Sequence, residues 1–331
     1  PLIRIAKENT MAASRVLVTI PWFGQSSDAL ERLVRGGCEV VRSPVPSPVK
    51  EADLLAALRG CRAIIAGGDA LTRAVIEGSP DLAVIARFGV GVDTVDVAAA
   101  TERGIPVAIA TNEEAVADLA FALLLALARR VVEADAYVRR GEWGRFDGAD
   151  VWSRTLGIVG TGRIGAAVMR RAHGFGMRIL CHDVRPDESL ARSLGAAYVP
   201  LERLFAESDF VTLHCSLNDA TRGLVGRREL ASMKPTAMLV NTARPGIVDE
   251  AALADALRER RLAGFAADVF APAPPPRDWP LFAFPNVITT PWMASYTPDN
   301  MARMEIACAE NVLRVLAGQP PLAAVNAPAA R

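Results

Sequence analysis

Three glycines between an apolar run and a helix-like segment constrain the fold more than any other feature of the chain. Gly160, Gly162 and Gly165 directly follow the apolar run 156–159 and lead into the segment 164–175. In a strand–turn–helix unit the first glycine permits a tight turn, the second lets the backbone approach a diphosphate, and the third lets helix and strand pack closely. The motif therefore predicts a parallel α/β domain that binds a dinucleotide.

Residues around this motif indicate which dinucleotide it binds. The amides of Arg163 and Ile164 open the helix, whose positive end suits a diphosphate, and the Arg163 guanidinium can add a contact. The next apolar run ends at Asp183, eighteen residues after Gly165. A carboxylate there can accept hydrogen bonds from both adenosine-ribose hydroxyls and repels a 2′-phosphate. The positive charge of Arg185 partly offsets that repulsion. We therefore expect the site to bind NAD with a moderate preference over NADP.

The apolar runs of the second half of the chain predict a doubly wound sheet. Six strands are expected, over residues 156–159, 178–182, 210–214, 237–241, 264–269 and 287–289. Helices are expected over residues 164–175, 188–194 and 250–260. Near-continuous apolar strands joined by crossover helices form parallel sheets that are covered on both faces. This region is predicted to be a Rossmann-type domain.

The first ~110 residues show the same alternation on a smaller scale. Strands are expected over residues 15–20, 39–42, 63–66, 83–88 and 106–109, and helices over 28–35, 50–59, 72–77 and 94–103. The pattern predicts a flavodoxin-like domain. The fold class is therefore α/β with two Rossmann-like parallel-sheet domains. A last helix is expected at about 298–317, followed by an Ala-rich, loose tail.

A long helix should connect the two domains. Thr111 and Glu114 fit a capping box at its beginning, and its apolar surface predicts burial on most sides. The stretch 133–150 after it contains Trp143 on a Gly-rich background and resembles an arm. It is either a packed surface loop or part of a dimer interface.

Composition excludes several classes of protein. Lys plus Arg and Asp plus Glu number 37 each in 331 residues, which argues against a general nucleic-acid or anionic-membrane surface. The longest apolar run, 119–128, is too short to span a bilayer. Five cysteines without a C-x-x-C pair favour a reducing, cytoplasmic compartment, and three scattered histidines predict no metal site. Residues 1–10 show no signal-peptide pattern, and Met11 could be the natural start.

Several separate motifs resemble one known family. These are the glycine motif, Asn241-Thr-Ala-Arg244, the run 249–253, Ala267-Asp268-Val-Phe270 and the stretch 86–93. Together they resemble the D-isomer-specific 2-hydroxyacid dehydrogenases over about residues 15–325. The resemblance implies a substrate domain made of residues 1–110 and 295–331, and an NAD-binding domain over 111–294. It further implies an active site between the domains, a small 2-hydroxy or 2-oxo carboxylic acid as substrate, and a homodimer.

The resemblance also assigns roles to single residues on the NAD-binding side. Arg244 matches the arginine that grips the substrate carboxylate beside the cofactor. Asp268 matches the aspartate that orients the nicotinamide amide, or is an ordinary strand-end cap. His214, Cys215 and Thr242 match positions that line the nicotinamide pocket, where His214 is more often structural than catalytic.

Two loops of the N-terminal domain match substrate-facing loops of the family. Val90 and Gly91 match the loop whose backbone amides hold the substrate carboxylate. Gly68 belongs to a second such loop, Gly67-Gly68-Asp69.

The chain departs from the family where a proton must be transferred. The family has a histidine in a Thr-Pro-His stretch, whereas this chain reads Thr290-Pro291-Trp292. The glutamate that pairs with that histidine falls at Ala273. Reduction of a ketone leaves an alkoxide that needs a proton, and the indole of Trp292 can only donate a hydrogen bond. Trp292 either closes an unused cleft or forms a wall that selects an aromatic or small substrate.

Two main hypotheses follow. The first is an NAD-dependent oxidoreductase in which another group handles the proton: Tyr296, expected one helical turn beyond Trp292, or His214, Asp69 or water. The second is an NAD(H)-binding sensor or interaction protein that has lost turnover. An isomerase or lyase that uses NAD without net redox change is a third option, for which no particular residue argues.

Overall fold

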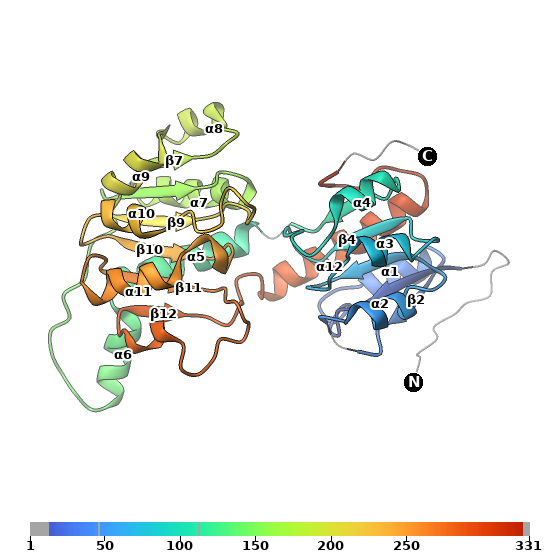
Figure 1. The fold of residues 1–331 in the computed structure, drawn as a ribbon, viewed down its shortest axis with the longest axis horizontal. Coiled ribbons are helices and arrows are strands. Elements are labelled where there is room, and N and C mark those ends of the chain that lie inside the picture. The colour runs from blue at the N-terminus through green and yellow to red at the C-terminus, as the bar shows by residue number, and fades with distance from the viewer. Residues whose placement is uncertain (1–12, 46, 112, 327–331) are drawn as a thin grey trace. The chain divides into compact units, whose positions relative to one another are not determined.

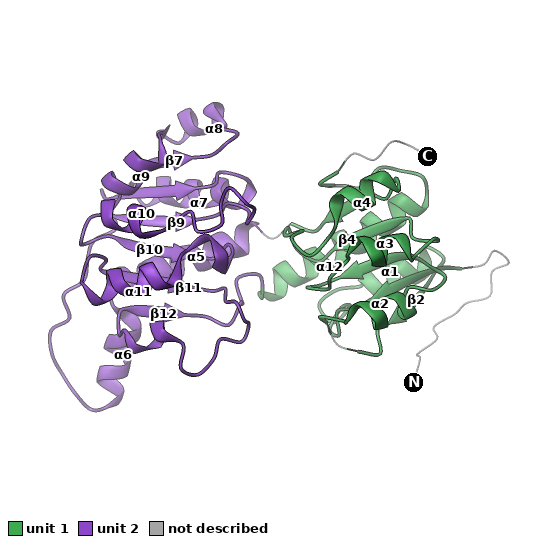
Figure 2. Ribbon diagram, in the orientation of Figure 1, with its two compact units in different colours: residues 1–112, 296–331 green, residues 113–295 purple. Residues whose placement is uncertain are grey.

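The computed structural model describes residues 13–326 except residues 46 and 112. The candidate start Met11 and residues 1–10 lie outside the described residues. The chain divides into two compact units (Figure 2). Unit 1 comprises Pro1–Asn112 and Tyr296–Arg331, and unit 2 comprises Glu113–Ser295.

Unit 1 is built on a five-stranded parallel sheet with the order β2-β1-β3-β4-β5 (Figure 1). Its strands are β1 (Ser14–Val18), β2 (Cys38–Arg42), β3 (Cys61–Ala66), β4 (Val84–Arg87) and β5 (Val107–Ile109). Its helices are α1 (Ala29–Arg35), α2 (Glu51–Ala57), α3 (Arg73–Glu77), α4 (Val97–Glu102) and α12 (Pro298–Leu316). The predicted flavodoxin-like pattern is present.

The two faces of this sheet have separate apolar cores. Side chains of α2, α3 and α4, such as Leu54, Ile76 and Ala99, pack with Leu17 and Ile64 of the strands on one face. On the other face α1 and α12 bury further apolar side chains, Leu33, Met304 and Val312 among them, against Val16, Ile65 and Val84. The C-terminal helix thus completes the N-terminal domain because it supplies part of one core.

The tail after α12 is not loose as far as residue 326. Ile109 N donates to Ala323 O at 3.0 Å, and Val325 N donates to Val107 O at 3.0 Å. Asn326 Oδ1 accepts from Val107 N at 2.8 Å. The edge strand β5 has unpaired backbone groups, and the tail satisfies them, so a composition rich in alanine did not predict its structure.

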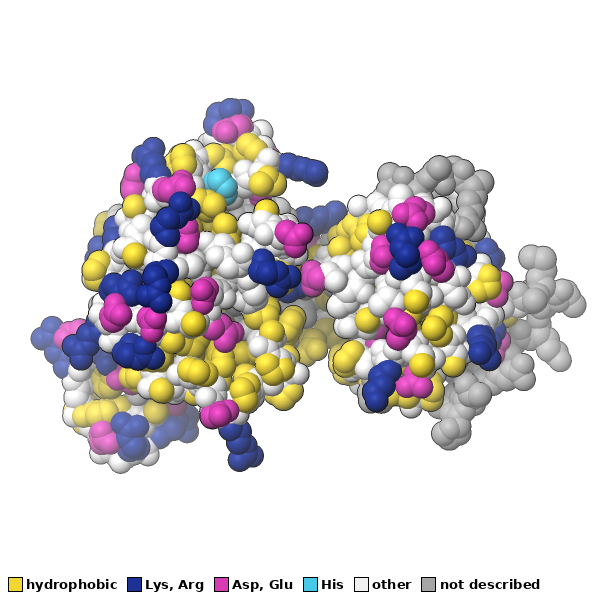
Figure 3. All heavy atoms as spheres, in the orientation of Figure 1, with side chains coloured by type: hydrophobic (Ala, Val, Ile, Leu, Met, Phe, Trp, Pro, Cys, Tyr) yellow, Lys and Arg dark blue, Asp and Glu magenta, His cyan; other side chains and the backbone are white. Residues whose placement is uncertain are grey.

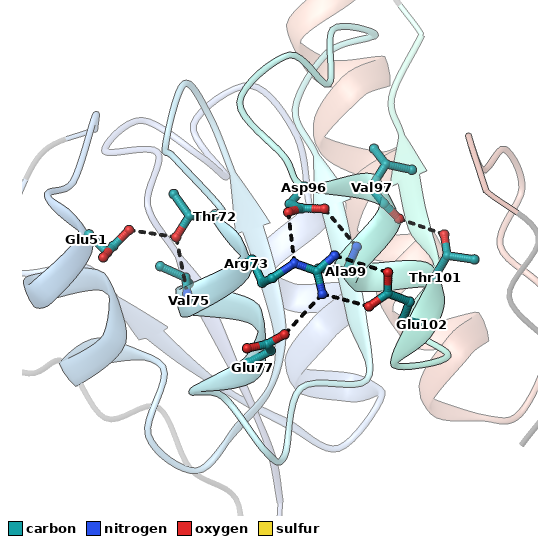
Figure 4. Close-up of polar contacts among 10 residues, drawn as sticks. All are labelled: Glu51, Thr72, Arg73, Val75, Glu77, Asp96, Val97, Ala99, Thr101 and Glu102. Atoms are coloured by element: carbon teal, nitrogen blue, oxygen red, sulfur yellow. Dashed lines mark hydrogen bonds and ion pairs between the residues drawn. The ribbon is translucent and has the colours of Figure 1, made fainter.

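Ion pairs join the beginning of α3 to α4 on the surface of unit 1 (Figure 4). Arg73 Nη1 lies 2.7 Å from Glu102 Oε2 and 3.1 Å from Glu77 Oε1, and its Nε lies 3.6 Å from Asp96 Oδ2. Asp96 also caps α4 by accepting from Ala99 N at 2.8 Å. The guanidinium holds the pKa of Glu102 below its ordinary value.

Unit 2 contains a seven-stranded parallel sheet with the order β12-β11-β10-β9-β6-β7-β8. Its strands are β6 (Thr155–Val159), β7 (Arg178–His182), β8 (Ala196–Tyr198), β9 (Phe210–Leu213), β10 (Met238–Asn241), β11 (Gly264–Ala267) and β12 (Val287–Thr289). The prediction of six strands was wrong, because β8 was missed. This edge strand is only Ala-Ala-Tyr and shows no apolar β-branched run.

Helices cover both faces of the second sheet (Figure 1). α5 (Glu113–Ala128) and α7 (Arg163–Gly174) cover one face, whereas α9 (Leu201–Glu207), α10 (Arg227–Ser232) and α11 (Glu250–Arg258) cover the other. Short elements complete the unit: α8 (Glu188–Ser193) and the 3₁₀ turns η1 (Pro245–Ile247) and η2 (Pro280–Ala283). The two-domain α/β fold predicted from the sequence is confirmed.

The long helix begins differently from the prediction. α5 starts at Glu113, and the preceding residue lies outside the described residues. The predicted capping-box glutamate, Glu114, instead pairs with Arg170 and Arg171 of α7, each at 2.9 Å. Two guanidinium groups on the neighbouring helix attract this carboxylate more strongly than a backbone amide does.

After α5 the chain forms α6 (Val131–Arg139) and then residues 140–150, so the predicted arm, residues 133–150, contains most of a helix. None of the α6 residues is buried, and Trp143 is 89% exposed. No described helix has the length and apolarity needed to cross a bilayer. Basic and acidic side chains alternate over the face seen in Figure 3, in keeping with the balanced charge.

Candidate active site

The predicted site residues of unit 2 follow successive strands of one parallel sheet. The glycine motif follows β6, Asp183 follows β7, His214 follows β9, Arg244 follows β10 and Asp268 follows β11. Because all seven strands are parallel, these residues gather at the carboxyl edge of the sheet. Sequential strand order reverses between β6 and β9, the position at which open α/β sheets bind ligands.

Backbone contacts account for two of the three glycines. Gly160 has φ +90°, and a Cβ there would lie 2.5 Å from the amide nitrogen of Cys215. A Cβ on Gly165 would collide with the carbonyl oxygen of Gly160. Gly160 N also donates to His182 O at 2.8 Å, which fastens the turn to β7. These glycines allow β6, β9 and α7 to meet closely.

Gly162 has a different environment. It precedes α7 with φ −60°, and no atom of the chain lies within 4 Å of the position of a Cβ. Neither backbone strain nor packing within the chain requires glycine here. The next residues, Arg163 and Ile164, open the helix, where first-turn amides lack partners within the helix. The space above Gly162 suits a ligand that approaches the backbone closely.

Asp183 is held beside the glycine turn by three hydrogen bonds. Its Oδ2 accepts from Thr161 N at 2.5 Å and from Thr161 Oγ1 at 3.2 Å. Its Oδ1 accepts from the backbone amide of Arg185 at 2.8 Å. A carboxylate has about four acceptor positions, so one remains on Oδ1 for a ribose hydroxyl.

His214 and Cys215 lie where β9 adjoins the turn. His214 Nε2 pairs with Thr212 Oγ1 at 2.8 Å, and Nδ1 is buried without a hydrogen-bond partner among the described residues. Burial lowers the pKa of His214 to about 3, so the ring is neutral at neutral pH. Burial also raises the pKa of Cys215 to about 11, so its thiol stays protonated. Neither side chain provides an acidic or basic group near pH 7.

Arg244 stands on a turn that buried Asn241 braces from within. Asn241 Nδ2 donates to Arg244 O at 2.8 Å, and its Oδ1 accepts from Ala243 N at 3.0 Å. The guanidinium donates to Ala243 O at 2.7 Å through Nη1. Thr242 is buried, and its Oγ1 has no hydrogen-bond partner among the described residues. The turn thus presents a cation and an unpaired hydroxyl next to each other.

Asp268 organises the chain that follows β12. Its Oδ1 accepts from Thr290 Oγ1 at 2.7 Å and Met293 N at 2.8 Å, and its Oδ2 accepts from Ala294 N at 2.9 Å. Burial raises the pKa of this carboxyl, although the three donors favour the charged form. Asp268 therefore shapes the loop that carries Trp292, as a strand-end cap would.

The two positions where the family resemblance places an acid–base pair are both exposed. Trp292 is 41% exposed and takes φ +54°, with its backbone amide bonded to Thr290 O at 2.9 Å. Ala273 is exposed on the loop between β11 and η2. An indole and a methyl group at these positions can transfer no proton near neutral pH.

The loops predicted to face substrate in unit 1 also follow strand ends. Gly68 follows β3 and is exposed, whereas Val90 and Gly91 follow β4. Arg87 supports the second loop, since its Nε donates to Gly91 O at 3.0 Å. Asp69 is fully buried, and its oxygens accept from Thr19 Oγ1 at 2.5 Å and from Val49 N at 2.8 Å. This carboxylate joins loops and is not a proton donor in contact with solvent.

Tyr296 was placed wrongly by the sequence analysis. It is not one helical turn beyond Trp292, because residues 290–296 form no helix and α12 begins at Pro298 after its cap Thr297. Tyr296 belongs to unit 1, whereas Trp292 belongs to unit 2. Its ring, 52% exposed, packs edge-on against Trp22 with centroids 6.2 Å apart. Pro298 favours the first turn of a helix, which explains the late start.

The carboxyl edge of unit 2 fits NAD. A polar ligand would fill the open space over Gly162 and accept or donate hydrogen bonds at three further groups. These are the remaining acceptor position on Asp183 and the unpaired polar atoms of His214 and Thr242. When bound, NADH supplies the hydride for reduction of a carbonyl group. No described cluster of His, Cys, Asp or Glu could hold a metal ion.

Sequence reasoning missed two residues of this edge. Thr161, within the glycine motif, holds Asp183, and Thr212 holds His214. The second could have been found from strand periodicity, because residues two apart on a strand share a face. The first depends on the pairing of β6 with β7 and has no local signal.

The comparisons with known proteins agree with this geometry. Residues 121–294 match the family described as D-isomer specific 2-hydroxyacid dehydrogenase, NAD binding domain. A glyoxylate reductase of Korarchaeum cryptofilum is 45% identical over 292 residues, which cover 85% of this chain and 87% of that protein. A D-3-phosphoglycerate dehydrogenase of Methanocaldococcus jannaschii is 38% identical over 95% of this chain but only 60% of its own length.

Solved structures support the same relationship. The crystal structure of a Thermus thermophilus protein superposes with a TM-score of 0.83 at 41% identity, covering 94% of this chain and 100% of that one. A glyoxylate reductase from Paecilomyes thermophila gives a TM-score of 0.84 at 29% identity, with 95% and 99% covered. The chain is an oxidoreductase that uses NAD, and it belongs to the D-isomer-specific 2-hydroxyacid dehydrogenase family.

Proposed function

We propose that this protein reduces glyoxylate or a similarly small 2-oxo acid with NADH, and that water supplies the proton. The observation that carries the proposal is the braced Arg244 turn beside an edge that fits NAD. A guanidinium there can hold a carboxylate and stabilise the developing alkoxide. The relatives with similar sequences named glyoxylate reductase favour an enzyme over a cofactor-binding sensor.

Water is the proton source that best suits the residues present. His214 is neutral at pH 7 because burial lowers its pKa to about 3, and Asp69 is buried with both oxygens engaged. Trp292 and Ala273 are exposed, so solvent reaches their loops. The remaining candidate side chain is Tyr296. Turnover that survives Tyr296→Phe within about twofold would support water, and a loss of about 10²-fold or more would assign the proton to Tyr296.

We assign residues 1–110 with 295–331 as the substrate domain and residues 111–294 as the NAD-binding domain, close to the bounds of units 1 and 2. Gly68, Val90 and Gly91 would contribute backbone amides to the carboxylate of the substrate, together with Arg244. The unpaired Thr242 hydroxyl and His214 ring suit the nicotinamide end, and Asp268 would orient it through the loop it caps. Trp292 and Ala273 would then border the substrate without exchanging a proton.

The decisive experiment restores the missing pair. Trp292→His with Ala273→Glu should raise kcat/KM for glyoxylate by about 10²–10⁴-fold, whereas either single change should do much less. The matched control combines Trp292→His with Ala271→Glu, an exposed alanine two residues earlier in the same loop. The panel should include hydroxypyruvate, pyruvate and phenylpyruvate. A wild-type protein that binds NADH tightly but reduces none of these acids would refute the proposed function in favour of a sensor.

We also propose a homodimer in a reducing compartment such as the cytoplasm. Val131, Val132 and Val138 of α6 are each more than half exposed, as is Trp143. A cavity of about 350 Å³ lies beside the arm, lined by Leu127, Val132 and Met238 among others. All five cysteines are free thiols. Light scattering should give a dimer mass for the wild type and a smaller mass for Trp143→Ser; a monomeric wild type would contradict the proposal.

A further inference from the structure

We propose that Tyr198 is a positioning residue for NAD specificity, because it holds Asp183 in place through Thr161. Three neighbouring strands each contribute one member of this chain of hydrogen bonds: Thr161 follows β6, Asp183 follows β7 and Tyr198 ends β8. In-register pairing brings them together, with Val159 opposite His182 and Cys181 opposite Tyr198. The proposal concerns cofactor binding and does not depend on the proposed substrate.

The hydrogen bonds have a defined direction. Asp183 is a carboxylate and can only accept, so the Thr161 hydroxyl donates its one proton to Oδ2 at 3.2 Å. Since that proton is used, Tyr198 must be the donor of the 2.7 Å hydrogen bond between its hydroxyl and Thr161 Oγ1. The Tyr198 oxygen in turn accepts from Asp187 N at 3.0 Å. The hydroxyls of Thr161 and Tyr198 thus each donate one hydrogen bond and accept one, so the proton of each hydroxyl has an acceptor.

This chain of bonds fixes the face that Asp183 presents to a ligand. Thr161 N and Oγ1 occupy Oδ2, and Arg185 N occupies one position of Oδ1. The remaining acceptor position on Oδ1 is therefore held in one direction. A ribose hydroxyl of NAD can donate to it. The 2′-phosphate of NADP would instead be repelled by a carboxylate whose hydrogen bonds prevent it from rotating away. Tyr198 thus sharpens the discrimination that Asp183 provides.

Tyr198→Phe tests the proposal, because phenylalanine keeps the ring and removes only the hydroxyl. We expect the Kd for NADH to rise about 3–10-fold, the effect of one or two weakened hydrogen bonds, with less than a twofold rise for NADPH. The ratio of the Kd for NADPH to that for NADH should therefore fall. Tyr137→Phe is the matched control, since that hydroxyl lies on α6 near the Trp143 carbonyl oxygen at 3.4 Å. It should leave both constants unchanged.

Changes at Thr161 provide an independent test that does not rely on Tyr198→Phe. Thr161→Val should lower the NADPH-to-NADH ratio of Kd values as Tyr198→Phe does, and Thr161→Ser, which keeps the hydroxyl, should preserve it. The double variant Tyr198→Phe with Thr161→Val should be no worse than Thr161→Val alone, because both changes break one chain of bonds. Tyr198→Phe that leaves the ratio unchanged, or weakens NADH and NADPH equally, would overturn the proposal.

Discussion

The carboxyl edge of the seven-stranded sheet has two halves, which differ in how many of the residues expected from the family resemblance they carry. The cofactor half, at the ends of β6, β7 and β8, has a glycine turn and a carboxylate, Asp183, that the chain itself holds in place. The proposed substrate half, at the ends of β10, β11 and β12, has Arg244 and Asp268 but carries Trp292 and Ala273 at the positions where the family resemblance places an acid–base pair.

From this difference we expect cofactor binding and proton transfer to be separable in this fold. We propose that cofactor binding depends on the backbone geometry of the glycine turn and on the Asp183 carboxylate that this turn holds. The family resemblance places the proton-transferring pair at Trp292 and Ala273, two positions on exposed loops. We therefore expect changes at these two loop positions to leave the fold and the cofactor half unchanged.

The largest effect is expected from Arg244→Gln, which tests whether the substrate half still works. Loss of the charge should lower kcat/KM for glyoxylate by about 10²–10³-fold, the cost of removing an electrostatic contact to a developing charge. The Kd for NADH should change by less than about threefold. Arg227→Gln on α10 is the control and should leave kcat/KM unchanged. If Arg244→Gln lowered NADH affinity as much as turnover, the division of the edge into a cofactor half and a substrate half would be contradicted.

The next largest effect is expected within the cofactor half, from alanine at two of its glycines. Gly162→Ala should fold normally, since no atom lies near the added Cβ, but should raise the Kd for NADH about tenfold by blocking close approach of the diphosphate. Gly165→Ala should instead lower stability by roughly 1–3 kcal/mol, because its Cβ meets the Gly160 carbonyl oxygen. Calorimetric titration and thermal unfolding separate the two outcomes. Unaltered NADH binding by Gly162→Ala would argue against the assigned diphosphate site.

His214, at the junction of the halves, should give the protein a pH-dependent stability. Its folded pKa of about 3 lies below the unfolded value of 6.5, so the unfolded state binds the proton more readily. Stability should therefore fall as pH decreases from 6.5 towards 3, by no more than about 1.4 kcal/mol per pH unit from this residue. His214→Gln should remove that slope in urea unfolding, whereas His173→Gln, at an exposed position, should keep it.

The smallest effect is expected away from both halves, at the ion pairs of unit 1 (Figure 4). Arg73→Gln should lower the Tm by about 1–2 °C at low salt, and the difference should vanish near about 1 M salt because exposed charges are screened. The contribution of Glu102, whose pKa Arg73 lowers, is present at neutral pH and is lost on acidification through the carboxyl range. A loss of NADH binding in Arg73→Gln would show that the edge of unit 2 is not independent of this cluster.

The amino-acid sequence by itself determined the fold class and predicted most of the candidate cofactor site. Apolar runs that alternate with helical segments specify parallel sheets, and glycines at fixed spacing specify the turn, because both signals are local. The departures at Trp292 and Ala273 were likewise visible as single letters. The short edge strand β8 was not visible, since Ala-Ala-Tyr forms a strand only where β7 offers it unpaired backbone groups.

Only the tertiary structure decided what several polar side chains do. Asp69, predicted in a substrate-facing loop, joins loops of unit 1, and Asp268 caps a strand end and shapes the loop that follows β12, because their partners come from distant segments. The neutral state of His214 follows from burial, and the bonds from Tyr198 to Asp183 require three strands in register. Sequence patterns report the neighbours of a residue along the chain, whereas charge state and hydrogen bonding depend on its neighbours in space.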